Sequence, residues 1–101
     1  MMQRWTATWD GALIEVRFED VPFSKSDASL GRYPTGELLV DGVSLVRRAS
    51  DSPTSVELRA ALRRPGGGRA GICARVRCGS KAVSCDIRID NQRLNVSPCR
   101  F

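Results

Sequence analysis

Histidine is missing altogether from the 101 residues of this chain. This absence excludes catalytic triads that use an imidazole as general base, and zinc or iron sites with histidine ligands. Four cysteines are present, but their spacing lacks the paired C-x2-C knuckles of zinc sites: they are Cys73, Cys78, Cys85 and Cys99. We therefore expect neither a metal nor a cofactor.

The residue pairs needed for acid–base or nucleophilic catalysis are also missing. Glu15 and Glu19 are expected to alternate with Arg17 on a solvated strand face, which does not shift pKa values as a catalytic pocket does. Ser80 and Lys81 are sequence neighbours, and neighbouring side chains rarely point the same way. The sequence therefore predicts that the protein is not an enzyme.

A glycine-rich stretch matches the dinucleotide-binding pattern G-x-G-x-x-G at Gly66, Gly68 and Gly71. That function requires a helix after the third glycine, whose N-terminus receives the pyrophosphate. The residues after Gly71 instead alternate as a strand does. We interpret the stretch as a hairpin loop.

Long hydrophobic runs are absent, so no membrane span is expected. The first residues contain no apolar core of a signal peptide, which favours a cytoplasmic protein. The alternative is an exported protein whose leader was removed. In that case the four cysteines would form two disulfides, with three possible connectivities.

What the sequence does contain is alternation with period two, interrupted by tight turns. Asp10-Gly11 is a type I′ hairpin pair and sets Trp5 opposite Val16. Asp41-Gly42 is a second such turn, expected to set Leu38 opposite Leu45. Asp90-Asn91 is a third, since asparagine tolerates positive φ.

Two more alternating segments, residues 56–62 and 72–78, flank the glycine-rich loop. A short helix from Pro53 through Leu62 is the local alternative. In total the sequence predicts a single domain over residues 1–101, an all-β antiparallel sandwich or small barrel of about eight strands built from hairpins. The predicted core contains Trp5, Trp9, Ile14, Val16, Phe18, Leu38, Val40, Leu45, Leu58, Val76, Ile87, Ile89 and Leu94.

Positive charge is concentrated in the second half of the chain. Residues 52–101 contain 10 basic and 3 acidic residues, against 6 and 8 in residues 1–51, and 14 of the 16 basic residues are arginines. Four further arginines, Arg47, Arg48, Arg88 and Arg93, are expected on neighbouring strands. The candidate binding residues on one predicted hairpin and its loop are Arg59, Arg63, Arg64, Arg69, Arg75 and Arg77.

An irregular connection over residues 20–36 carries the aromatic residues Phe23 and Tyr33. Loops of this length in a small domain often carry function, so both aromatics are candidate binding residues. The competing interpretation is an ordered crossover whose aromatics cover one end of the sandwich.

Two stretches resemble the Fas apoptosis inhibitory molecule family. The first contains Trp9-Asp10-Gly11, the following segment 14–19 and the later Val40-Asp41-Gly42; the second is the hairpin of residues 85–94. Together they cover about half of the chain. The resemblance implies a cytosolic β-sandwich that acts as a non-enzymatic protein-interaction module.

The sequence therefore predicts a binding module with a protein partner. The excess of arginines favours an acidic partner. The alternative is a nucleic-acid or polyanion-binding domain that uses the same arginines. Self-association is a further hypothesis, through an exposed sheet edge or through Leu39 and Val46, which are expected to share an apolar second face.

Overall fold

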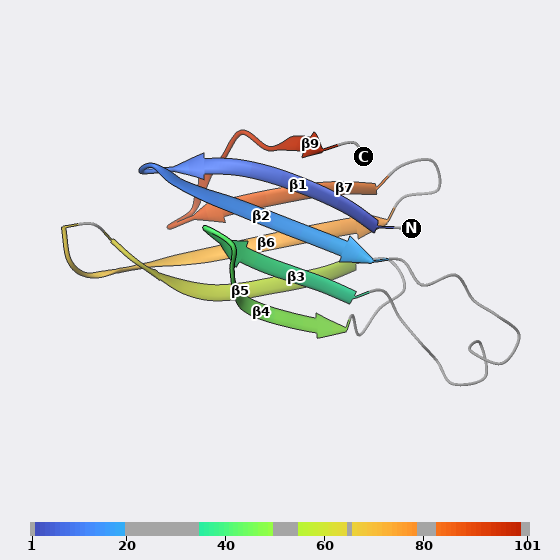
Figure 1. Ribbon diagram of the computed structural model, residues 1–101, viewed down its shortest axis with the longest axis horizontal. Coiled ribbons are helices and arrows are strands. Elements are labelled where there is room, and N and C mark those ends of the chain that lie inside the picture. Colours follow the sequence, from blue (N-terminus) through green and yellow to red (C-terminus); the bar gives the residue numbers. More distant parts are fainter. Residues whose placement is uncertain (1, 20–34, 50–54, 65, 79–82, 100–101) are drawn as a thin grey trace, which may run out of the picture.

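Two antiparallel β-sheets make up the fold of the computed structural model, which describes residues 2–19, 35–49, 55–64, 66–78 and 83–99. The predicted all-β antiparallel fold is confirmed (Figure 1). The first sheet has the order β4-β3-β2-β1-β9 and the second the order β5-β6-β7-β8. The nine strands are β1 (Met2–Trp9), β2 (Ala12–Glu19), β3 (Thr35–Val40), β4 (Val43–Ala49), β5 (Ser55–Arg63), β6 (Arg69–Cys78), β7 (Val83–Ile89), β8 (Gln92–Arg93) and β9 (Ser97–Cys99).

The connectivity explains why the fold lies between a sandwich and a barrel. Strands β1 to β4 follow one another as hairpin neighbours, and so do β5 to β8. The chain then crosses from β8 to β9, which pairs with β1 of the first sheet. At the opposite edge β4 lies beside β5 without a ladder between them in the described residues (Figure 1).

The three turns expected from the sequence are present. Asp10, Asp41 and Asp90 have φ of 48°, 50° and 49°, and the residue after each also has positive φ. This double left-handed backbone is the type I′ geometry that suits the twist of paired strands. As predicted, Trp5 pairs with Val16 across the first turn.

The second hairpin differs from its predicted register. A β-bulge lies between Leu38 and Leu39, so that Leu38 pairs with Val46 and Leu39 with Ser44. Leu45 is the extra residue of β4 and is 39% exposed, so its predicted place in the core was wrong. Val46 packs against the core, while Leu39 is buried outside the core cluster, so the two do not share one apolar face.

Most of the predicted core is confirmed. Nine of its thirteen residues are buried, and Trp9, Val40 and Leu94 are partly buried against them. The other buried members of the cluster come mainly from β5 and β6: they are Ala7, Val56, Leu62, Ala70, Ile72 and Ala74. Strand β5 is regular from Ser55 to Arg63, so the alternative of a short helix there was wrong.

The glycine-rich stretch forms the connection between β5 and β6, as predicted. Gly67 and Gly68 have positive φ, and the amide of Arg64 donates to the Gly68 carbonyl. Strand β6 begins at Arg69, so no helix follows the third glycine. The dinucleotide-binding pattern therefore lacks its structural context.

Gly36 allows the two sheets to approach closely. It is buried in β3, and a Cβ atom there would lie 3.1 Å from Cγ1 of Val56 and 3.2 Å from Cδ1 of Leu58, both on β5. Since interiors are densely packed, a Cβ atom at this position requires the Val56 and Leu58 side chains to shift by a few tenths of an ångström.

We predict that Gly36→Ala lowers the free energy of unfolding by roughly 1–3 kcal/mol, the usual cost of overpacking. Gly71→Ala is the matched control, because the nearest atom to its Cβ, Oδ1 of Asp90, is 3.9 Å away. We expect that variant to be as stable as the wild type or slightly more stable. Urea unfolding of the three proteins measures the difference, and equal midpoints would show that β3 and β5 are not in tight contact at Gly36.

Candidate functional site: an arginine face on the second sheet

The outer surface of the second sheet collects arginines from four strands. Val56 and Leu58 on β5 point into the core, and so does Ile72 on β6. Because side chains alternate along a strand, the odd-numbered residues of both strands point outward. We call this surface the arginine face and define it by the outward arginines Arg59, Arg63, Arg69, Arg75, Arg77, Arg88 and Arg93.

Two carboxylates on the face form ion pairs with four of these arginines. Glu57 forms ion pairs with Arg59 at 2.6 Å and with Arg75 at 3.5 Å. The pKa of Glu57 is lowered, first by the hydrogen bond from Arg59 and then by the one from Cys73. Asp86 on β7 pairs with Arg88 at 3.3 Å and with Arg93 at 3.0 Å.

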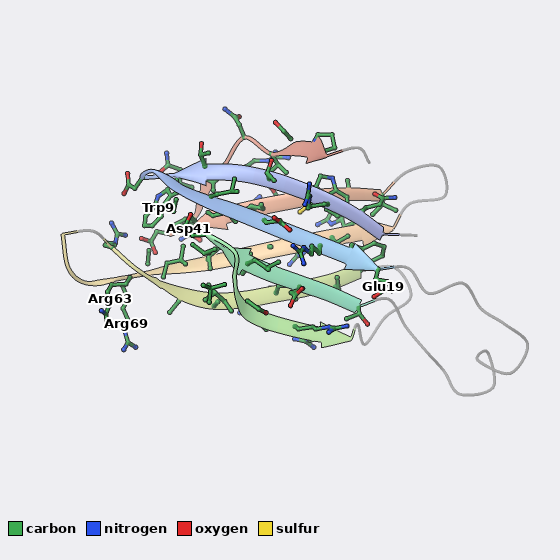
Figure 2. All side chains as sticks on the ribbon, viewed as in Figure 1. Trp9, Glu19, Asp41, Arg63 and Arg69 are labelled. Atoms are coloured by element: carbon green, nitrogen blue, oxygen red, sulfur yellow. The ribbon has the colours of Figure 1, made fainter. Side chains whose placement is uncertain are left out.

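Three arginines of the face lack an acidic partner among the described residues. Arg63, Arg69 and Arg77 form no ion pair with any residue that the structure describes. Arg63 and Arg69 are also directly opposite each other at the end of the β5–β6 hairpin, where like charges destabilise the pair. Both are labelled in Figure 2. These guanidinium groups are available to an anionic ligand.

The middle of the face is hollowed into a groove of about 480 Å³. Gly71 and Cys73, which have small side chains, lie in its lining, and Cys73 is paired with Arg59 on one side and with Arg88 on the other. Arg75 and Arg77 complete its basic lining. Glu57 and Asp86 also line the groove and pair with Arg59, Arg75 and Arg88, so Arg77 is the lining arginine without an acidic partner among the described residues. A guanidinium binds a carboxylate or a phosphate through two parallel hydrogen bonds, so the Arg77 end of the groove suits an anion.

The described thiols are poorly suited to nucleophilic chemistry. Sγ of Cys73 lies 3.4 Å from Oε1 of Glu57, and burial, followed by this hydrogen bond, raises the pKa of Cys73. Cys85 points into the sandwich, where burial raises its pKa to about 12. Both are free cysteines, whereas the side chains of Cys78 and Cys99 lie outside the described residues. Disulfide formation stays a prediction.

The structure brings most of the predicted binding residues together. Arg59, Arg63, Arg69, Arg75 and Arg77 all lie on the face, and Arg64 lies in the following turn, paired with Asp90. Arg88 and Arg93 join them from β7 and β8, as expected.

Other predicted residues lie elsewhere. Arg47 and Arg48 belong to β4, which lies beside β5 but is part of the first sheet, so they are not on the arginine face. Phe23 and Tyr33 lie outside the described residues. Two further members of the site, Glu57 and Asp86, were not named from the sequence, although period-two alternation along β5 and β7 places them outward. Cys73 was expected as a possible disulfide cysteine, and the structure places it in the groove of the face as a free thiol.

Comparison with known proteins adds no relative: no family model matches the sequence, and no curated protein or solved structure matches the chain. The resemblance to the Fas apoptosis inhibitory molecule family therefore stays a prediction. Among the described residues no cluster of acidic and cysteine side chains could hold a metal ion. In the same part of the chain, no helix has the length and apolar character needed to cross a bilayer.

We predict that Glu57→Gln makes Cys73 react faster with iodoacetamide at pH 8. The carboxylate favours the protonated thiol, so its removal lowers the pKa of Cys73 and increases the reactive thiolate. Cys85 should remain the slower of the two in both proteins. Peptide mass spectrometry measures alkylation at each cysteine separately, and Glu37→Gln on β3 is the matched control. An unchanged alkylation rate of Cys73 in Glu57→Gln would show that Glu57 does not control the reactivity of this thiol.

Proposed function

We propose that the protein is a non-enzymatic binding module that uses its arginine face to bind an acidic segment of another protein. The observation that carries this proposal is the charge of one sheet surface, where seven arginines stand against two carboxylates. The first sheet offers no comparable surface in its described residues, because its outward Arg4, Arg17 and Arg47 alternate with Glu15, Glu19 and Glu37.

A hydrogen-bonded sheet is a suitable support for such binding. Its strands hold the arginine backbones at fixed spacings, so ligand binding orders only side chains. The groove across Gly71 and Cys73 gives a carboxylate access to Arg77, which has no ion pair with a described residue. Net positive potential also speeds the encounter with acidic partners.

The alternative partner is a nucleic acid, which would use the same guanidinium groups on phosphates. Single-stranded nucleic acids are usually also held by bases stacked on aromatic side chains. The described residues of the arginine face include no Phe, Tyr or Trp. We therefore favour an acidic protein, and phosphate binding becomes an outcome of the test.

We predict that Arg77→Glu weakens binding of a fluorescein-labelled octaglutamate peptide about tenfold, corresponding to roughly 1.4 kcal/mol. Arg77 suits this test because it lines the groove and has no ion pair with a described residue. Arg47→Glu changes the net charge equally but lies on β4, so it should bind like the wild type. Fluorescence anisotropy at 50 mM and 200 mM salt measures both affinities.

The same titration with a labelled twelve-residue oligo-dT separates the two classes of partner. Tighter binding of oligo-dT than of octaglutamate, with a steep salt dependence, would replace the acidic protein by a nucleic acid. Equal losses in Arg77→Glu and Arg47→Glu would show that only net charge matters. No binding of either probe at 50 mM salt would contradict a binding role for the arginine face.

A further inference from the structure

A second groove, of about 550 Å³, opens at the turn end of the sandwich. It lies between the first two hairpin turns and the end of β5, and its apolar lining comes from both sheets: Trp9, Ala12, Val40, Leu45, Ala61 and Leu62. Leu45, the extra residue of the bulge, remains 39% exposed there, and Val43 of the same strand is 63% exposed. An exposed apolar surface therefore lies at this end of the sandwich.

The edge of β5 runs along this groove. Strand β5 pairs with β6 on one side, and within the described chain no strand pairs with it on the other. Figure 1 shows β4 beside the first part of β5 only, and the end of β5, marked by Arg63 in Figure 2, continues past it.

The hydrogen-bond pattern shows which backbone groups of this edge are free. In the adjoining turn the amide of Arg64 donates to the carbonyl of Gly68 across the hairpin. Because bonding alternates along an antiparallel pair, even-numbered residues of β5 bond to β6 and odd-numbered residues face the open edge. The N–H and C=O groups of Arg59, Ala61 and Arg63 are therefore directed away from β6.

We propose that an extended segment of the partner protein, with alternating apolar and acidic residues, pairs as an added strand with residues 59–63 of β5. This inference rests on the proposed function and specifies the partner's chemistry. In this pairing, the apolar partner residues opposite Leu62 and Ala60 enter the apolar groove beside Leu45. The acidic partner residues between them lie on the side of the arginine face, near Arg59 and Arg63.

Charge complementarity favours a foreign segment over a second copy of β5. Two antiparallel copies paired over residues 59–63 would set Arg59 of each copy against Arg63 of the other. Like charges directly opposite each other destabilise such a pair. Acidic residues at the same positions instead meet Arg63, which has no ion pair with a described residue.

Two peptides of equal composition test the alternation. The first is acetyl-Glu-Leu-Glu-Val-Glu-Leu-Glu-amide, and the second, acetyl-Glu-Glu-Leu-Val-Leu-Glu-Glu-amide, groups its apolar residues. We expect the alternating peptide to bind about tenfold more tightly, because only it can pair with the edge and fill the groove together. Its binding should also shift tryptophan emission to shorter wavelength, since Trp9 lines the groove and is only partly buried.

A proline substitution tests the backbone pairing itself. Ala61→Pro removes an edge N–H without removing a hydrogen bond from the β5–β6 ladder, a change that edge strands tolerate. We expect it to reduce the affinity for the alternating peptide to that of the grouped peptide. Ala61→Thr is the matched control, because it keeps the N–H group and should therefore bind the alternating peptide more tightly than Ala61→Pro does.

Each result has a distinct meaning. The edge pairing would be overturned if the wild type bound both peptides equally, or if a folded Ala61→Pro bound the alternating peptide as tightly as the wild type does. If the wild type still bound octaglutamate in that case, the proposed function would stand. If the wild type bound neither octaglutamate nor either of the two peptides, the proposed function would be contradicted as well. If Ala61→Pro does not fold, Leu45→Gln replaces it in the test. This variant should bind the alternating peptide more weakly than the wild type and octaglutamate with the same affinity. Wild-type affinity for both probes would contradict the inference.

Discussion

The in-register pairing of β5, β6 and β7 is the constraint on which the rest of the structure depends. Each strand has apolar residues at alternate positions, and the register places these in one layer, with Leu58, Ala74 and Ile87 side by side. A slip of one residue would bury Arg59 or Arg75 and expose Ile72. The same register that forms the core therefore also assembles the arginine face, without further information in the sequence.

Collecting seven arginines on one sheet has an electrostatic cost, which the arrangement only partly offsets. Glu57 and Asp86 occupy the same row, on either side of Arg75, and each forms ion pairs with two arginines. These pairs are largely exposed, so each contributes little to stability. Their main effect is to reduce repulsion in the middle of the sheet, and the uncompensated charge remains at Arg77 and at the hairpin end.

The sequence predicted those features that local chemistry determines. Asp-Gly and Asp-Asn pairs identify type I′ turns, and a two-residue turn sets the register of its hairpin, as for Trp5 and Val16. Alternation then placed the arginines of β5 and β6. It could not reveal the bulge at Leu38 and Leu39, because one extra residue in an apolar stretch leaves the pattern of residue types unchanged. Alternation also could not show that Arg47 lies off the arginine face, because the sequence does not reveal which sheet a strand joins.

The apolar groove could not be predicted either, because it depends on how the two sheets end relative to each other. The bulge and the free edge act together there. Natural sheets protect their edges with short strands, bulges or prolines. In the described chain β8 has 2 residues, β9 has 3, and the β3–β4 pair carries the bulge. Strand β5 has 9 residues with no proline and no bulge, so it is the edge that remains open to pairing beside the exposed Leu45.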